Sequence, residues 1–169
     1  MDIKEISKVL RNILRVGVVS SVNPAAATAR VTFADRDDMV SKELHIGVQG
    51  AHGTKHYWVP HVGEQVLCAF NPNDRNLGEG YILLSLYNTQ DTTPSGSSSV
   101  RMIQFDDGTI VMNDGGAITV EATGSVTIKS PSITIQGGSG DIVVDGVSLV
   151  NHTHGGVIPG GSSTAPPNK

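Results

Sequence analysis

The C-terminal half of the chain carries short runs of β-branched residues separated by Gly or Pro turns. The runs are Ile-Thr-Val, Val-Thr-Ile, Ile-Thr-Ile and Ile-Val-Val, and they begin at Ile118, Val126, Ile133 and Ile142. The two-residue period of a strand places the outer apolar residues of each run on one face and the central residue on the other. Strands this short cannot bury an apolar face alone, so stacked neighbours must cover it. The pattern predicts a repetitive β-needle.

The composition of this segment suits an intertwined oligomer. Between Gly116 and Val150 the chain has no Phe, Tyr, Trp or Met, and Leu149 is the one Leu. Uniform β-branched residues fit a narrow core whose layers resemble one another. A single ribbon would leave open strand edges, which pair with other chains. We therefore expect residues 101–150 to form a trimeric β-helix in a homotrimer with three-fold closure.

The N-terminal residues 1–14 have the pattern of a short amphipathic helix. Apolar residues recur at spacings of three and four, with charged residues between them: Ile3, Ile6, Val9, Leu10, Ile13 and Leu14. This periodicity is typical of one helix face. A helix of about twelve residues is marginal in isolation, so its stripe must dock on its own domain, on sister chains or on a partner.

Residues 15–90 have an all-β pattern. Five strand candidates lie between turn signals, at 16–22, 29–33, 44–48, 65–70 and 80–87. Five short antiparallel strands in a segment of this length favour a small OB-type barrel, and a five-stranded sandwich is the alternative. The Ser- and Thr-rich residues 91–100 read as a linker.

A hairpin begins the needle. Residues 100–105 and 108–112 are strand candidates around Asp106-Asp107-Gly108. The Asp pair could be read as acids for hydrolysis. Neighbouring residues in a strand or turn point apart, however, and Asp-Asp-Gly is explained by turn chemistry.

Composition and charge exclude several classes of protein. The formal net charge is −4, which argues against a nucleic-acid surface, since such a surface needs clustered Lys and Arg. No apolar run approaches the roughly 18 residues of a membrane span, and the charged N-terminus does not read as a signal peptide. Cys68 lies in an apolar run and is expected to be a buried hydrophobe, with a reactive thiol as the alternative.

Two histidines mark the end of the needle, in residues 151–169. His152 and His154 are two apart, so on an extended segment they project on the same side. Three chains would bring six imidazoles to one axis, a nitrogen shell that suits Fe(II) or Ni(II) better than Zn. The alternative is a solvated His/Gly/Ser tail. Four further histidines, with Glu64 nearby, read as surface residues of a loop and its flanks: His45, His52, His56 and His61.

Several motifs together resemble a known family. They are the stretch Trp58-Val-Pro-His-Val-Gly-Glu-Gln-Val-Leu, the triplet Phe70-Asn-Pro, the strand from Gly80 to Asn88, the needle and the terminal His-x-His. This combination resembles the baseplate assembly protein V family, the central spikes of contractile phage tails and R-type pyocins, which is similar also to type VI secretion spikes. The resemblance spans the chain and implies an OB domain, a membrane-piercing apex and iron as the metal at His152 and His154.

The function expected from the resemblance is mechanical. It implies a non-enzymatic homotrimer in the baseplate of a virion or tail-like particle, assembled in the host cytoplasm. Residues 1–90 would attach it to the baseplate hub and tail tube, and the needle would pierce the bacterial outer membrane on sheath contraction. A tail-associated cell-wall hydrolase and a glycan-binding tail module are the alternatives. A hydrolase would need a catalytic triad, an HExxH motif or two facing carboxylates.

Overall fold

A computed structural model describes residues 2–72, 74, 76–136, 140–153, 156 and 160 of the chain. The fold divides into two units, residues 1–121 and residues 122–169. Most described residues in regular structure lie in strands, and α1 (Ile3–Ile13) is a short helix at the N-terminus. Among the described residues, no helix has the length and apolar character that crossing a membrane requires.

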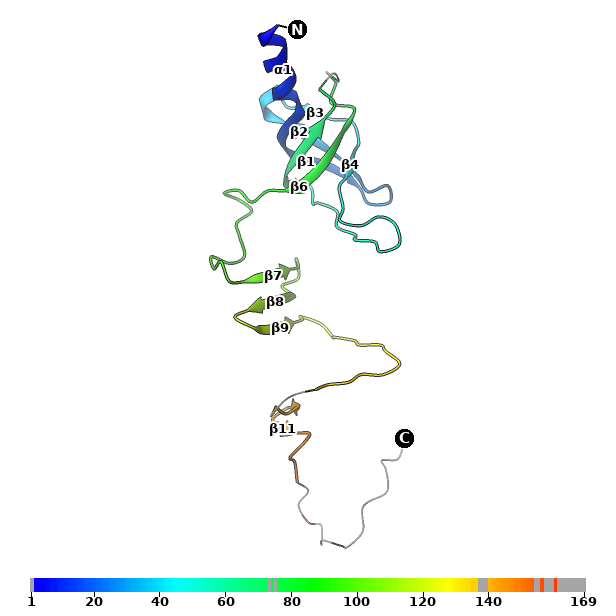
Figure 1. Ribbon diagram of the computed structural model, residues 1–169, viewed down its shortest axis with the longest axis vertical. Coiled ribbons are helices and arrows are strands. Elements are labelled where there is room, and N and C mark those ends of the chain that lie inside the picture. The colour runs from blue at the N-terminus through cyan, green and yellow to red at the C-terminus, as the bar shows by residue number, and fades with distance from the viewer. Residues whose placement is uncertain are drawn as a thin grey trace. The chain divides into compact units, whose positions relative to one another are not determined.

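The first unit contains a closed barrel of five strands (Figure 1). These strands are β1 (Leu14–Asn23), β2 (Thr28–Phe33), β4 (Leu44–Ile46), β5 (Gln65–Phe70) and β6 (Gly80–Ser85). The pairs β1–β2, β2–β4, β5–β6 and β1–β5 are antiparallel, and the parallel pair β4–β6 closes the ring. The predicted barrel is thereby confirmed, and the sandwich alternative is wrong.

Alternation along the strands places the small apolar core inside the barrel. Phe33 and Phe70 meet edge to face with their ring centroids 5.5 Å apart. Around them lie further fully buried side chains, namely Val19, Val31, Leu44, Val66 and Cys68. Gly17 is required at its position, because a Cβ there would lie 2.5 Å from Val31 Cγ1 and 2.8 Å from Phe33 Cε1.

Two short elements follow β2 and were not predicted. They are the 3-10 helix η1 (Ala34–Arg36) and β3 (Met39–Val40), which pairs with the end of β2. Both are too short to produce a periodic pattern in the sequence.

A three-stranded antiparallel sheet completes the first unit (Figure 1). It consists of β7 (Arg101–Gln104), β8 (Ile110–Asp114) and β9 (Ala117–Glu121). The turn between β7 and β8 contains Gly108 at φ 88°, whose amide donates to the Phe105 carbonyl at 3.0 Å. The predicted hairpin is confirmed, and Asp107 serves the turn because its carboxylate accepts the amide of Thr109 at 2.9 Å.

The second unit has little regular structure. Residues 122–136, which the structure describes without a gap, form neither helix nor strand. After the next described residue, 140, comes a small hairpin of β10 (Val143–Val144) and β11 (Val147–Ser148). Single-chain strands at 126–128 and 133–135 are therefore absent, and the trimeric β-helix stays a prediction that a single chain does not test.

Candidate apex site and exposed needle faces

The hairpin β10–β11 positions the described part of the apex. Its two-residue turn is Asp145-Gly146, with φ values of 48° and 80°, as a type I′ turn requires. Beyond β11 the chain turns back, and the amide of Leu149 donates to the carbonyl of Ile142 at 2.8 Å. The amide of Asn151 then donates to Ser148 Oγ at 2.6 Å. These bonds hold the backbone just before His152.

His152 is held in an orientation that suits a metal ligand. Its Nδ1 lies 2.8 Å from the carbonyl oxygen of Ser148. A carbonyl only accepts, so Nδ1 carries the proton, and in the neutral ring the lone pair is on Nε2. Metal-bound histidines in proteins commonly use this arrangement, in which one ring nitrogen donates to a carbonyl and the other binds the ion.

Asp141 is a neighbour of His152 that sequence reasoning missed. Its carboxylate accepts the amide of Val150 at 3.2 Å. Hydrogen bonding from Ser148 lowers the pKa of Asp141 below its usual value, with smaller contributions from backbone amides and from an electrostatic interaction with His152. Asp145 is the acid nearest to His152 along the chain. The hairpin instead brings Asp141 close, and no motif in the sequence signals that contact.

The single chain does not provide a complete set of ligands. His154 lies outside the described residues, so its position relative to His152 is not tested. Within the described ranges, no three His, Cys, Asp or Glu side chains form a group that could hold a metal ion.

The other histidines are spread over the first unit. His45 lines a groove beside β6, and His56 lines a separate concavity near Trp58. His61 Nε2 lies 3.2 Å from Asp106 Oδ2, in the turn that opens the three-stranded sheet. Trp58 packs on Phe105 beside this pair, with centroids 6.5 Å apart. Loop 47–64 thus contacts the turn between β7 and β8, where Trp58 has a packing role.

The three-stranded sheet leaves an apolar row exposed. Ile103 pairs with Val111, and Val111 pairs with Val120, so the three side chains lie side by side on one face. They are 45%, 40% and 56% exposed, and Ile118 on the same face is 76% exposed. In the second unit Val126, Ile128, Ile133 and Ile135 are also more than half exposed. Exposed contiguous apolar surface of this kind marks interaction sites.

The described residues thus combine a closed barrel, an exposed apolar face on the sheet that follows it and a hydrogen-bonded imidazole at His152. Residues 146–168 match a family model described as the GpV Apex motif. The chain is also similar to the protein named Spike protein of Escherichia phage P2, with 27% identity over 136 residues, which are 80% of this chain. The match spans 61% of the length of that relative. Both matches agree with the resemblance to phage spike proteins.

Proposed function

We propose that three copies of the chain form the central spike of a contractile phage tail or tail-like particle. The observation that carries this proposal is the match of residues 146–168 to an apex motif, because these residues follow the β-branched runs and include the held imidazole of His152. The similarity to a phage spike protein over most of the chain points the same way.

The exposed apolar runs support the trimeric needle. Residues 122–136 have the alternation of strands, but none of the described strands pairs with them. A strand needs a neighbour for its backbone groups, and an apolar face needs cover. Two further copies would supply both along residues 101–150, and three-fold closure would remove the open edges.

The apex would hold one iron ion, bound by His152 and His154 of each chain. The carbonyl-bound Nδ1 of His152 fits this role, because it leaves Nε2 as the ligand atom. A shell of six imidazoles suits Fe or Ni better than Zn, and the resemblance to the spike family favours iron over Ni. When bound, the ion would link three chain ends at one point.

In this proposal the work of the spike is mechanical and non-enzymatic. The N-terminal helix and barrel would attach to the baseplate hub and the tail tube, and sheath contraction would drive the needle into the bacterial outer membrane. Deleting residues 101–169 should therefore leave the remaining chain able to join particles while the particles lose infectivity or killing. A folded truncated chain that fails to join particles would contradict this division of roles.

Native mass spectrometry combined with elemental analysis tests the proposal. The purified protein should be a trimer with one iron per three chains. The double variant His152→Ala, His154→Ala should lose the iron and remain trimeric, because the apolar runs hold the needle independently. The matched control His52→Ala, His56→Ala removes two exposed histidines of a loop and should keep the iron. A monomeric parent protein, one ion per chain, or iron retained in the apex variant would refute the proposal.

A further inference from the structure

The orientation of α1 on its own barrel is fixed by a polar network at the C-terminal end of the helix. Asn12 Oδ1 accepts hydrogen bonds from Arg15 Nη2 and from Arg36 Nη2, both at 2.6 Å. Arg15 also pairs with Asp35. The helix contacts β1 and β5, and Val9 and Ile13, four residues apart on one face, are half-buried. This network and these contacts determine which face of α1 points away from its own barrel.

The outward face of α1 combines apolar and basic side chains. Ile3, Ile6 and Leu10 are 82%, 42% and 62% exposed, and their spacing places them on one stripe. Lys4 and Arg11 flank the stripe on one side and are also exposed. A shallow groove of about 480 Å³ runs along this side, lined by Ile3, Lys4, Ser7, Arg11, Asn12 and Arg15. Ile3 and Leu10 therefore stay exposed although the helix packs on the barrel of its own chain through Val9 and Ile13.

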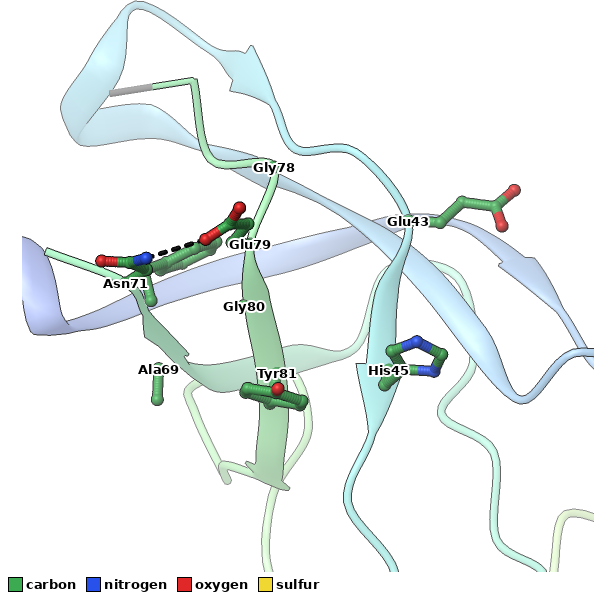
Figure 2. A pocket seen from close by; sticks show the side chains of 9 residues that line it. Glu43, His45, Ala69, Asn71, Gly78, Glu79, Gly80 and Tyr81 are labelled. Atoms are coloured by element: carbon green, nitrogen blue, oxygen red, sulfur yellow. Dashed lines mark hydrogen bonds between the residues drawn. The ribbon is translucent and has the colours of Figure 1, made fainter. Parts of the chain in front are cut away.

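The barrel presents a groove of the opposite character (Figure 2). It has a volume of about 590 Å³ and lies at the start of β6. Ala69 and Tyr81 are cross-strand neighbours there, and Tyr81 is 59% exposed. Glu43 and Glu79, both exposed, add two carboxylates to the lining.

The carboxylates give the groove an acidic character. Both carboxylates accept a hydrogen bond from a neutral group, Glu43 from Thr28 Oγ1 at 3.1 Å and Glu79 from Asn71 Nδ2 at 2.7 Å. Lys42 lies nearby, but it interacts electrostatically with Asp74. Among the described residues that line the groove, Glu43 and Glu79 carry carboxylates and none is Lys or Arg.

We propose that α1 of one copy docks in the Glu43–Tyr81 groove of a second copy. The stripe Ile3–Ile6–Leu10 covers Ala69 and Tyr81, and Lys4 and Arg11 face Glu43 and Glu79. One chain carries both complementary surfaces, each exposed, so a second copy supplies what the first lacks. Such a head-to-tail contact between unlike surfaces closes into a ring when the rotation permits. The inference rests on the proposed trimer and adds a contact between barrels that is independent of the needle.

Disulfide trapping in the assembled protein tests this contact directly. Chains with Leu10→Cys and differently tagged chains with Tyr81→Cys are co-expressed, so that any disulfide between the two tags joins two copies. We expect cross-linked pairs in this mixture, and covalent trimers when both substitutions are in one chain. The matched control carries Asn23→Cys in place of Tyr81→Cys. Asn23 is exposed at the C-terminal end of β1, opposite to the end that follows α1, so this control should give no cross-link with Leu10→Cys.

The outcomes separate this inference from the proposed trimer. If the parent protein is a trimer but the Leu10–Tyr81 pair does not cross-link, α1 docks elsewhere, for instance on a hub protein, and the inference alone fails. Disulfides formed by Leu10→Cys chains with one another would show a bundle of helices and would also overturn it. A monomeric parent protein would overturn both proposals.

A charge exchange provides a second, reciprocal test. Lys4→Glu with Arg11→Glu should lower the cross-linking yield about tenfold, because two attractive pairs become repulsive. Glu43→Lys with Glu79→Lys should have a similar effect. Combining all four changes should restore the yield. If the variant with all four changes is folded but its cross-linking yield is not restored, the pairing of these charges is refuted.

Discussion

The exposed face of β9 allows a direct measurement of needle assembly. Ile118 and Val120 lie on one face of the three-stranded sheet and are 76% and 56% exposed in the single chain. We consider the double variant Ile118→Thr, Val120→Thr, which keeps β-branched side chains and so preserves the strand preference. Because both residues face solvent in one chain, the variant should hardly change the stability of a monomer. Any larger loss of stability reports burial against other copies.

The size of the loss follows from the exposed fractions. Complete burial of an Ile or Val side chain stabilises a fold by about 2 kcal/mol. In the single chain, about three quarters of this burial free energy is still to be gained for Ile118 and about half for Val120. Burial of both side chains on assembly would therefore stabilise each chain by roughly 2 to 3 kcal/mol. A buried Thr hydroxyl without a partner adds to the cost. Across three chains the trimer should lose roughly 6 to 9 kcal/mol.

Guanidinium unfolding at two protein concentrations, together with sedimentation, measures this loss. The unfolding midpoint of the parent trimer should rise with concentration by mass action, and the variant should unfold earlier and dissociate at micromolar concentration. Thr119→Ser is the control, because Thr119 lies on the opposite face of the same strand and loses only a methyl group. If the double variant is as stable as the parent and the control, these faces are solvent-exposed in the assembled protein, and the trimeric needle is wrong.

Three further predictions concern the barrel. Hydrogen bonds from backbone amides, that of Asn76 foremost, lower the pKa of Asp74. The ionised Asp74 therefore stabilises the fold at a pH above its unfolded pKa of 3.8, and this stabilisation is lost as the pH falls through the folded pKa. Asp74→Asn should lower the melting temperature at neutral pH and reduce its fall in acid. Burial raises the pKa of Cys68 to about 12, so a thiol reagent should label Cys68 only after unfolding. Gly17→Ala should destabilise the barrel by about 1 to 3 kcal/mol, because its Cβ would overlap Val31, whereas Gly96→Ala, which meets no atom within 4 Å, should be neutral in chemical unfolding.

The barrel could be predicted because its strands are short apolar runs separated by turn signals. Which residues of a run face the core was less visible: in β5 the buried Val66, Cys68 and Phe70 alternate with half-buried residues, although the whole run from Val66 to Phe70 is apolar in the sequence. The start of β1 was harder to predict. The apolar stripe of the helix continues through Leu14, but the helix ends at Ile13 and the strand begins directly at Leu14.

Contacts between distant segments could not be predicted. The packing of Trp58 on Phe105 and the pair His61–Asp106 join residues more than forty positions apart. Hydrophobic periodicity describes the local face of a strand and carries no information about which distant loop will cover it. The same limit applies to Asp141, which reaches the neighbourhood of His152 only through the turn at Asp145-Gly146.

The region 122–136 shows what an alternating pattern specifies and what it does not. Alternation at 126–128 and 133–135 defines two faces, but a strand also needs a partner for its backbone amides and carbonyls. None of the described strands pairs with these residues and they form no strand, whereas Ile118 and Val120 pair with β8 and do. β9 and residues 122–136 contain the same residue types and so have the same strand propensity. The reason that only β9 forms a strand is therefore that it has a partner strand. On this argument, adding the missing copies should convert residues 122–136 to strands without any change of sequence, and slow amide hydrogen exchange in this segment of the assembled protein would show it.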